Sequence, residues 1–278
     1  MRKFIWITSY PKSGNTMLRI FLSAYFFTKD GKITTLKTIK NITNFQSLIL
    51  KLKNVPSYED FKKNLTKVCP LWIQAQKLES ENNKKLILLK THNFMGSING
   101  HSFTNEKYTK GFIYVVRDPR SVVLSTKHHY NFTLNRSVGS LSNEKKFSLD
   151  TKNPVPEFIT SWKTHYLSWK KYSAVVPNII IKYEDMINEP KKIFLEILYF
   201  MKSILPFEID SEKFNNSLNS VNFDNLKNFE NAEGFEERLY GNFFREGKTD
   251  EWKEKLPNNY CKDIENLFKN EMSQLGYL

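Results

Sequence analysis

The sequence lacks the features on which several large classes of protein depend. Only two cysteines, Cys69 and Cys261, occur in 278 residues, which excludes a disulfide-held scaffold. No apolar run approaches the roughly 20 residues that a membrane-spanning helix needs. The first apolar run is also too short for a signal peptide, and it ends in a motif with proline and glycine. The chain does contain 40% hydrophobic residues, 22 of them Phe, so we predict a folded protein with a substantial core.

Acidic residues are scarce near the N-terminus. Residues 1–53 hold ten Lys and Arg residues against the single acid Asp30, so this part carries +9 of the net charge of +13. One interpretation is a partner that carries negative charge. The other is a lysine-rich composition with a solvated basic face. The charge count does not choose between them.

Metal and standard nucleotide motifs are also lacking. The five histidines form no cluster, and the two cysteines do not have metal-ligand spacing. The loop after the first apolar run does not end in the Gly-Lys-Ser/Thr of a phosphate-binding P-loop, because its lysine precedes its glycine. The chain has no internal repeat, low-complexity tract or interdomain linker. We therefore expect no metal site and a single domain over residues 1–278.

Short apolar runs alternate with stretches of helical periodicity. The runs are those expected of buried strands, at residues 4–8, 85–90, 112–116 and 178–183. Helical patterns follow three of them, at residues 16–22, 120–130 and 190–201. This alternation predicts an α/β fold in which a P-loop-like central parallel β-sheet is flanked by α-helices. Ligands of such folds bind at the carboxyl ends of the strands.

Two regions have weaker patterns. Residues 133–156 are polar, with Asn, Ser, Lys and Pro, and predict a surface loop or mobile cover. Residues 215–245 mix short apolar pieces with Asn and Glu.

The first chemical motif is the Tyr-Pro-Lys-Ser-Gly-Asn-Thr of residues 10–16. A strand that turns sharply into a helix leaves free backbone N–H groups at the start of the helix, where they bind phosphate. Gly14 allows close approach, and Lys12 adds a positive charge. The side chains of Ser13, Asn15 and Thr16 can donate hydrogen bonds. The alternative is an ordinary strand-to-helix turn.

The second motif is Lys90-Thr91-His92, at the end of a predicted strand. A histidine there can act as a general base near neutral pH, and Lys90 lies two residues back on the same side of the strand. A lone histidine is more often structural, but its position at a strand end favours chemistry. The remaining histidines lack this position: His101, His128, His129 and His165.

The third motif runs from Arg117 to Ser125, from the end of a strand into a helix. An arginine fork and a hydroxyl make a good phosphate clamp. The alternative is a helix capped by Asp118 with surface arginines.

The fourth motif covers residues 243–253, a basic segment with Arg245, Gly247 and neighbouring aromatic side chains. It could close over an anion or a base ring. The alternative is a surface loop anchored by Trp252.

In combination, these motifs resemble those of the PAPS-dependent sulfotransferases, which use 3′-phosphoadenosine 5′-phosphosulfate (PAPS). The family's Y-P-K-S-G-T-T-W loop is matched by residues 10–16, its K-T-H by residues 90–92, and its R-N/D-P-x-D-x-x-x-S by residues 117–125. Its S-W-x-x-H-x-x-x-W, Y-E-D-M and R-K-G-x-x-G-D-W-K motifs are similar to residues 161–169, 183–186 and 245–253. The chain departs from the family pattern at Asn15, Met17, Ser121, Glu246, Asp250 and Glu251.

The resemblance implies transfer of a sulfuryl group from PAPS to an acceptor hydroxyl or amine. It implies that His92 takes the acceptor's proton, that Lys12 stabilises charge on the bridging oxygen as the S–O bond breaks, and that Lys90 neutralises the transferring group. It also implies donor-binding roles for the following residues: Lys12, Ser13, Gly14, Asn15, Thr16, Arg117, Ser125, Tyr183, Arg245 and Gly247.

The resemblance further implies a cytoplasmic protein with a small-molecule or carbohydrate acceptor, no nucleic-acid partner, no transmembrane segment and no metal. The acceptor and the oligomeric state stay open. Two alternatives are a P-loop nucleotide-dependent kinase and a non-catalytic protein that binds nucleotides or nucleic acid. The sequence lacks the motifs expected of such a kinase. A binding function alone would not explain why the four motifs described above occur in this order.

Overall fold

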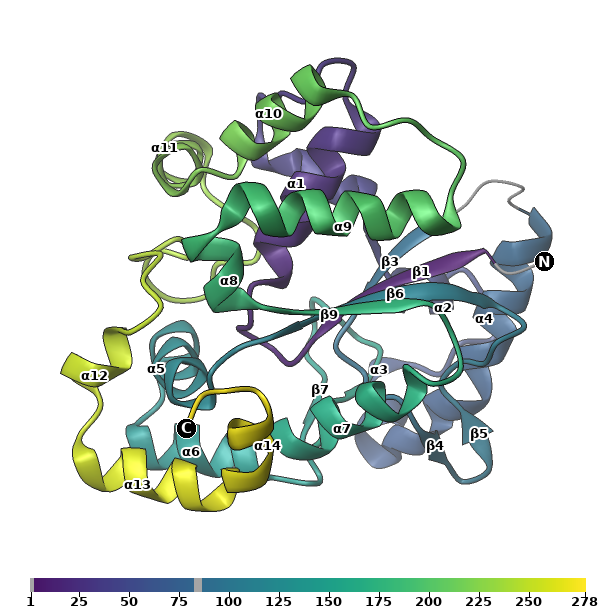
Figure 1. The fold of residues 1–278 in the computed structure, drawn as a ribbon. Coiled ribbons are helices and arrows are strands. Elements are labelled where there is room, and N and C mark those ends of the chain that lie inside the picture. Colours follow the sequence, from purple (N-terminus) through teal and green to yellow (C-terminus); the bar gives the residue numbers. More distant parts are fainter. Residues whose placement is uncertain (1–2, 83–86) are drawn as a thin grey trace. The chain divides into compact units, whose positions relative to one another are not determined.

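The fold is described here from a computed structural model, which covers residues 3–82 and 87–278 (Figure 1). The first part of the chain forms β1 (Phe4–Ser9), α1 (Asn15–Phe27), the 3₁₀-helix η1 (Leu36–Asn41), β2 (Thr43–Asn44), α2 (Phe45–Ile49), α3 (Tyr58–Lys63), the 3₁₀-helix η2 (Leu65–Val68), α4 (Cys69–Asn82), β3 (Ile87–Thr91), β4 (Ser97–Ile98), β5 (His101–Ser102) and β6 (Thr109–Val116). The second part forms α5 (Pro119–Tyr130), α6 (Leu134–Ser142), β7 (Phe147–Ser148), β8 (Glu157–Phe158), α7 (Trp162–Tyr172), β9 (Asn178–Lys182), α8 (Tyr183–Asn188), α9 (Pro190–Ile204), α10 (Ser211–Ser220), α11 (Phe223–Glu233), α12 (Glu251–Lys255), α13 (Asn258–Leu267) and α14 (Lys269–Gln274).

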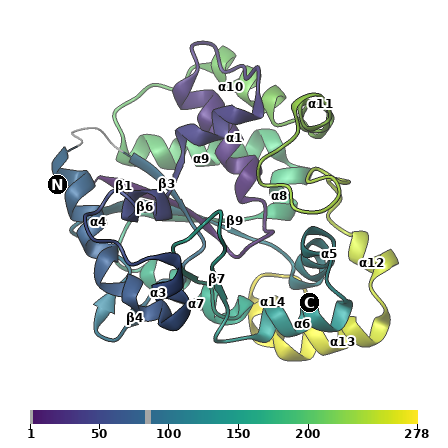
Figure 2. The same cartoon turned by 180° about the vertical axis from the view of Figure 1, so that it is seen from behind.

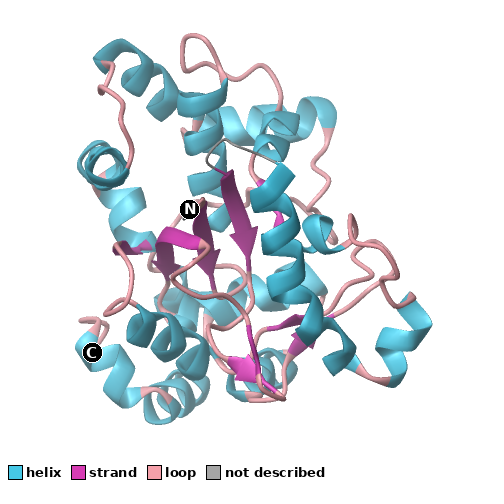
Figure 3. Ribbon diagram, turned by 90° about the vertical axis from the view of Figure 1, so that its right-hand side faces the viewer, coloured by secondary structure: helices cyan, strands magenta, loops and turns pink. Residues whose placement is uncertain are grey.

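The described residues form a five-stranded sheet in the order β2-β3-β1-β6-β9, with the strands drawn in magenta in Figure 3. Strands β1 and β3 are parallel, with Phe4 opposite Ile87 and Thr8 opposite Thr91. Strand β2 is also parallel to β3. This arrangement confirms the predicted α/β fold class with a central parallel sheet. Because β1 and β3 run in the same direction, their carboxyl ends, Ser9 and Thr91, lie at the same edge of the sheet.

The chain divides into two compact units. The first contains residues 1–10, 42–114 and 143–179, and the second contains residues 11–41, 115–142 and 180–278. The single domain expected over residues 1–278 stays a prediction.

The core of the first unit is built from aromatic side chains. All six residues of β1 are buried, as its apolar run predicts. The Trp6 ring lies 5.2 Å from Phe45 and 5.0 Å from Phe103, centre to centre, and Trp72 lies 5.6 Å from Phe103. The indole N–H of Trp6 donates to the Thr109 hydroxyl at 3.0 Å, so the one polar atom of this side chain is paired. This packing fixes β1 and therefore the point at which the chain leaves the sheet.

The second unit is organised around α1. Its residue Phe21 packs 4.3 Å from Phe194 of α9 and 6.1 Å from Phe214 of α10, measured between ring centres. Figures 1 and 2 show α1 beside both helices. The helical spacing of apolar residues along α1 therefore reflects burial against α9 and α10.

Most predicted elements are confirmed, and one region differs. The predicted strands and helices correspond to β1, β3, β6 and β9 and to α1, α5 and α9, although Lys85 and Leu86 lie outside the described residues. Residues 134–142, predicted as part of a loop or cover, instead form α6. The helix begins after Thr133, whose hydroxyl accepts from the Arg136 backbone N–H at 3.2 Å. Its Asn, Ser and Gly residues have weak helix propensity, and burial of Ser137 and Leu141 outweighs that weakness.

No helix in the described part of the chain is both long and apolar enough to cross a membrane.

Replacing Phe103 by Ala should lower the free energy of unfolding by about 3–5 kcal/mol, because a fully buried ring in the aromatic core is lost. Urea denaturation followed by circular dichroism would measure this change. The matched control is Phe147→Ala, since Phe147 is 46% exposed, and its cost should stay below about 1 kcal/mol. Equal costs for the two variants would contradict this description of the core.

Candidate active site

The turn between β1 and α1 depends on unusual backbone geometry. Lys12 has φ 69° and Gly14 has φ 97°, both in the left-handed region. A Cβ at residue 14 would lie 2.4 Å from Cδ2 of Tyr183, so a side chain there would clash as well as strain the backbone. Non-glycine residues rarely adopt this conformation, and they do so most often at functional sites. The glycine therefore lets the backbone of this turn pack directly against the Tyr183 ring.

Ser13 and the residues after it fit a phosphate group. The hydroxyl oxygen of Ser13 is buried and has no hydrogen-bond partner among the described residues. Gly14 is the N-cap of α1, which has no acidic residue in its first turn. The N-terminus of such a helix attracts anions. Asn15 and Thr16 begin the helix and are buried, and the Thr16 hydroxyl donates to Oε2 of Glu237 at 2.8 Å.

Lys12 is only partly accessible to water. Its ammonium lies 4.0 Å from the centre of the Phe243 ring. Loss of hydration lowers the pKa of Lys12 to about 7, with smaller lowering effects from Arg117 and Arg245 and an opposing effect of Glu237. At neutral pH Lys12 is therefore divided between the ammonium and the amine.

Arg117 supports the same turn. Its Nη1 donates to the Lys12 carbonyl at 3.1 Å, and its guanidinium lies 4.2 Å from the centre of the Tyr183 ring. Asp118 caps α5 by accepting from the Arg120 backbone N–H, as one interpretation of this motif expected. Ser125 lies on α5 and is half-buried. The structure thus brings Lys12, Arg117 and Tyr183 into one contact network.

The fourth motif is held by carboxylates. Arg245 forms a bidentate ion pair with Glu251, and its Nη1 lies 3.8 Å from Oε1 of Glu246. Gly247 has φ 66°, and a Cβ there would lie 2.7 Å from the Phe223 ring. The Ser121 hydroxyl on α5 donates to the Thr249 carbonyl at 3.1 Å, which connects this segment to the third motif. Arg245 therefore has a built-in anionic partner.

His92 lies in the first unit, just after β3. Its Nδ1 is 2.7 Å from the Ser9 carbonyl oxygen. A carbonyl only accepts hydrogen bonds, so Nδ1 carries the proton and the neutral ring has its lone pair on Nε2. This tautomer is the one required of a general base that acts through Nε2.

Glu157 of β8 organises the Lys90-Thr91-His92 strand end. The side chain is 3% exposed, and Oε1 accepts from the His92 backbone N–H at 2.7 Å and from the Thr91 hydroxyl at 3.2 Å. Its Oε2 lies 3.7 Å from Nζ of Lys90. A buried carboxylate thus balances the charge of the half-buried Lys90.

The predicted residues divide between the two units. Lys90 and His92 belong to the first, and the predicted donor-binding residues belong to the second. A sequence model of the sulfotransferase domain family matches residues 2–276.

The chain belongs to the sulfotransferase family.

Curated relatives are distant but span most of the chain. An amine sulfotransferase of Oryctolagus cuniculus is 23% identical and aligns over 96% of this chain and 80% of its own length. A flavonol 3-sulfotransferase of Flaveria bidentis is 24% identical, over 98% and 82%. A 3-beta-hydroxysteroid sulfotransferase of Cavia porcellus is 23% identical, over 75% and 72%.

Solved structures have the same fold. Retinol dehydratase, in complex with androsterone and the inactive cofactor PAP, matches with a TM-score of 0.65 at 17% identity, over 98% of this chain and 81% of that one. Mouse sulfotransferase SULT7A1, complexed with PAP, matches with a TM-score of 0.57 at 17% identity, over 97% and 84%. At this identity the likeness concerns the fold.

Two side chains of α7, both from the motif at residues 161–169, bind backbone carbonyl groups at and next to His92. Nε2 of His165 donates to the His92 carbonyl at 3.1 Å, and Nε1 of Trp169 donates to the Asn93 carbonyl at 3.0 Å. The Tyr114 hydroxyl lies 2.8 Å from Nδ1 of His165 and donates to it in this tautomer. Sequence reasoning gave His165 no role of its own, although its i, i+4 spacing with Trp169 places the two on one helix face.

Sequence reasoning also missed three charged residues of this sulfotransferase. They are Glu157, Glu237 and Lys146. The ammonium of Lys146 donates to the Tyr10 hydroxyl at 2.7 Å, and burial lowers the pKa of Lys146 to about 7. No local pattern marks any of the three, because each acts on a residue far away in the chain.

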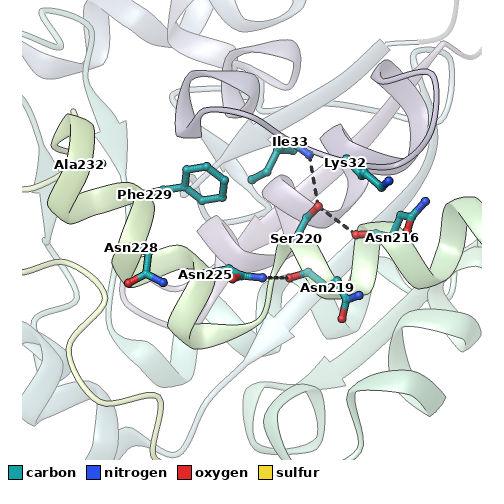
Figure 4. A pocket seen from close by; sticks show the side chains of 9 residues that line it. All are labelled: Lys32, Ile33, Asn216, Asn219, Ser220, Asn225, Asn228, Phe229 and Ala232. Carbon is teal, nitrogen blue, oxygen red and sulfur yellow. Dashed lines mark hydrogen bonds between the residues drawn. The ribbon is translucent and has the colours of Figure 1, made fainter.

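A groove of about 480 Å³ lies apart from the predicted residues, within the second unit (Figure 4). It is lined by α10, α11 and the Lys32–Ile33 segment, with Phe229 beside several asparagine side chains. The Asn225 amide donates to the Asn219 carbonyl at 2.8 Å and braces the two helices. None of the residues predicted to bind the donor lines this groove.

Burial predicts an unusual titration of His165. Its pKa is lowered to about 3, so the ring should stay neutral, protonated on Nε2, from pH 8 down to pH 5. Nitrogen-15 NMR of the ring would test this, with His165→Gln identifying the resonance. Because the unfolded chain takes up a proton below about pH 6.5 and the folded chain does not, this group should lower stability as pH falls from 6.5 toward 3. A ring that protonates near pH 6.5 in the folded chain would contradict the described hydrogen bonds.

Proposed function

We propose that this sulfotransferase transfers a sulfuryl group from PAPS to a hydroxyl or amine of a small-molecule or carbohydrate acceptor, with adenosine 3′,5′-bisphosphate as the other product. The observation that carries the proposal is the turn before α1. There the buried Ser13 hydroxyl has no partner among the described residues, and Gly14 lies against Tyr183 where a Cβ cannot fit. The Ser13 hydroxyl and the free backbone N–H groups at the start of α1 suit a phosphate group, which needs hydrogen-bond donors.

The second unit supplies the donor-binding groups. The turn residues Ser13–Thr16 would hold the 5′-phosphate, and Lys12 would stabilise negative charge on the oxygen that leaves the sulfur. Tyr183 would contact the adenosine end. Arg117, Ser125, Arg245 and Gly247 would bind the 3′-phosphate, and Arg245 would then exchange Glu251 for phosphate oxygens.

The first unit supplies the acid–base group. His92 would take the acceptor's proton on Nε2 as the acceptor's oxygen or nitrogen bonds to sulfur. The Ser9 carbonyl keeps the proton on Nδ1, so no tautomer change is needed. Lys90 would balance charge on the transferring group, with Glu157 holding it in place. Because lysines provide the positive charge, the proposal requires no metal.

The named relatives are consistent with a small acceptor. Their names specify an amine, a flavonol and a 3-beta-hydroxysteroid, all of which present a nitrogen or oxygen nucleophile. The acceptor of this chain can be sought by incubating it with labelled PAPS and a panel of amines, phenols, sterols and sugars.

Adenosine 3′,5′-bisphosphate should raise the melting temperature of the protein, whereas ATP with magnesium and single-stranded DNA should not. Lys12→Met should weaken bisphosphate binding by about tenfold or more, because a desolvated cation facing the anion is lost. Lys29→Met is the matched control, since Lys29 is exposed and lies in the same unit. Stabilisation by ATP or DNA alone would refute the proposed donor.

The same binding should depend on pH in a defined direction. With a pKa of about 7, Lys12 is largely neutral above pH 7 and must gain a proton to pair with the bisphosphate. Affinity measured by calorimetry should therefore fall as pH rises from 7 to 9, by up to about tenfold per unit. In Lys12→Met this dependence should disappear, and its persistence there would assign it to another group.

His92→Ala should lose about 10² to 10⁴ in turnover with whichever acceptor the labelled-donor panel identifies, while its affinity for the bisphosphate stays unchanged. His101→Ala is the control, because His101 is exposed and lies in the same unit. Near-normal turnover of His92→Ala would exclude this histidine as the base.

A further inference from the structure

Arg19 is a buried cation that is only partly satisfied. It lies on α1, one turn after Thr16, and is 6% exposed. Its Nη1 donates to Oε1 of Glu237 at 2.6 Å, whereas its Nε is buried without a hydrogen-bond partner among the described residues. An arginine carries five N–H donors in a planar fork, so this side chain can bind more acceptor oxygens than it does.

Glu237 contacts two groups of this helix at once. Its Oε1 accepts from Arg19, and its Oε2 accepts from the Thr16 hydroxyl. It also exerts the strongest charge effect on Lys12, in the direction that raises the pKa of that lysine. A carboxylate thus lies where the proposed function needs Thr16 and Lys12 to meet a phosphate.

The segment that carries Glu237 has a separate anchor. Glu230, on α11, is 2% exposed and accepts from the backbone N–H groups of Phe243 and Phe244 at 2.7 and 2.9 Å. Glu237 itself keeps 31% of its side chain exposed and lies between α11 and α12, outside regular secondary structure. The Glu230 contacts can therefore hold this segment when Glu237 moves away.

We propose that Arg19 extends the phosphate site at Thr16, and that Glu237 competes with the phosphate for both residues. The inference rests on the proposed function, because it adds Arg19 to the residues that bind the same donor and names Glu237 as a residue that opposes binding. A terminal phosphate of the bisphosphate offers three acceptor oxygens and up to two negative charges, against two oxygens and one charge for a carboxylate. It can therefore replace Glu237 and also reach Nε of Arg19.

The test uses calorimetry of the full chain with adenosine 3′,5′-bisphosphate. Glu237→Gln keeps the size and hydrogen-bonding capacity of the side chain but removes its charge, so affinity should rise by at least about fivefold, the lower end of typical coupling between sites. The matched control is Glu236→Gln. Glu236 is also acidic and exposed, but it pairs with Lys40 at 2.8 Å and not with α1. Its replacement should leave affinity unchanged.

A second pair of measurements separates binding from a structural role. Arg19→Met, introduced into Glu237→Gln, should abolish the gain, because the subsite loses its cation. In the wild type, bisphosphate should accelerate amide hydrogen exchange around Glu237 while it slows exchange at the start of α1. A purely structural ion pair would give neither result.

The outcomes distinguish the two levels of inference. If the bisphosphate binds the wild type and Glu237→Gln with equal affinity, or binds the variant more weakly, the competitor role is refuted and the proposed function stands. If no folded variant binds it, the proposed function fails, and the subsite fails with it.

Discussion

The close packing of Gly14 against the Tyr183 ring is the constraint on which the second unit depends. With no side chain at residue 14, the chain can leave β1, adopt left-handed geometry at Lys12 and Gly14, and begin α1 in little space. The same contact holds Tyr183 where Arg117 stacks on it, and Arg117 in turn binds the Lys12 carbonyl. The absence of a side chain at Gly14 therefore determines the backbone conformation of the turn, the position of the Tyr183 ring and the position of Arg117.

Carboxylates pair with several cations at or near the predicted site. Lys90 lies beside Glu157, Arg245 is paired with Glu251, and Arg19 is paired with Glu237. The net charge of +13 does not reveal this, since it counts surface lysines and buried pairs alike. When two opposite charges are paired in this way, a charged ligand can bind one of them only by replacing or sharing its partner. The chemistry of this site therefore depends on pairing more than on surplus charge.

Local patterns predicted the fold well and the partners poorly. The apolar run of β1, the turn and the spacing of α1 are short-range features, and each lies where the sequence indicated. Helix α6 was not predicted, because its residues have weak helix propensity and the helix is stabilised by tertiary packing. The pairing of Thr16 with Glu237 joins positions 221 residues apart, and that of His92 with Glu157 joins positions 65 apart. No local periodicity encodes contacts of this kind, whereas the order of the motifs did predict candidate site residues.

The desolvation of Lys12 and Lys146 has a further consequence for covalent chemistry. With a pKa of about 7, each of these side chains is a neutral amine in about half of the molecules at pH 7. An ordinary lysine is neutral in fewer than about one molecule in a thousand at that pH. Lys12 and Lys146 thus present nucleophilic amines near pH 7, unlike most lysines of this protein. They offer selective points of attachment for acylating or aldehyde reagents, one within the Tyr10–Thr16 motif and the other beside the Tyr10 hydroxyl.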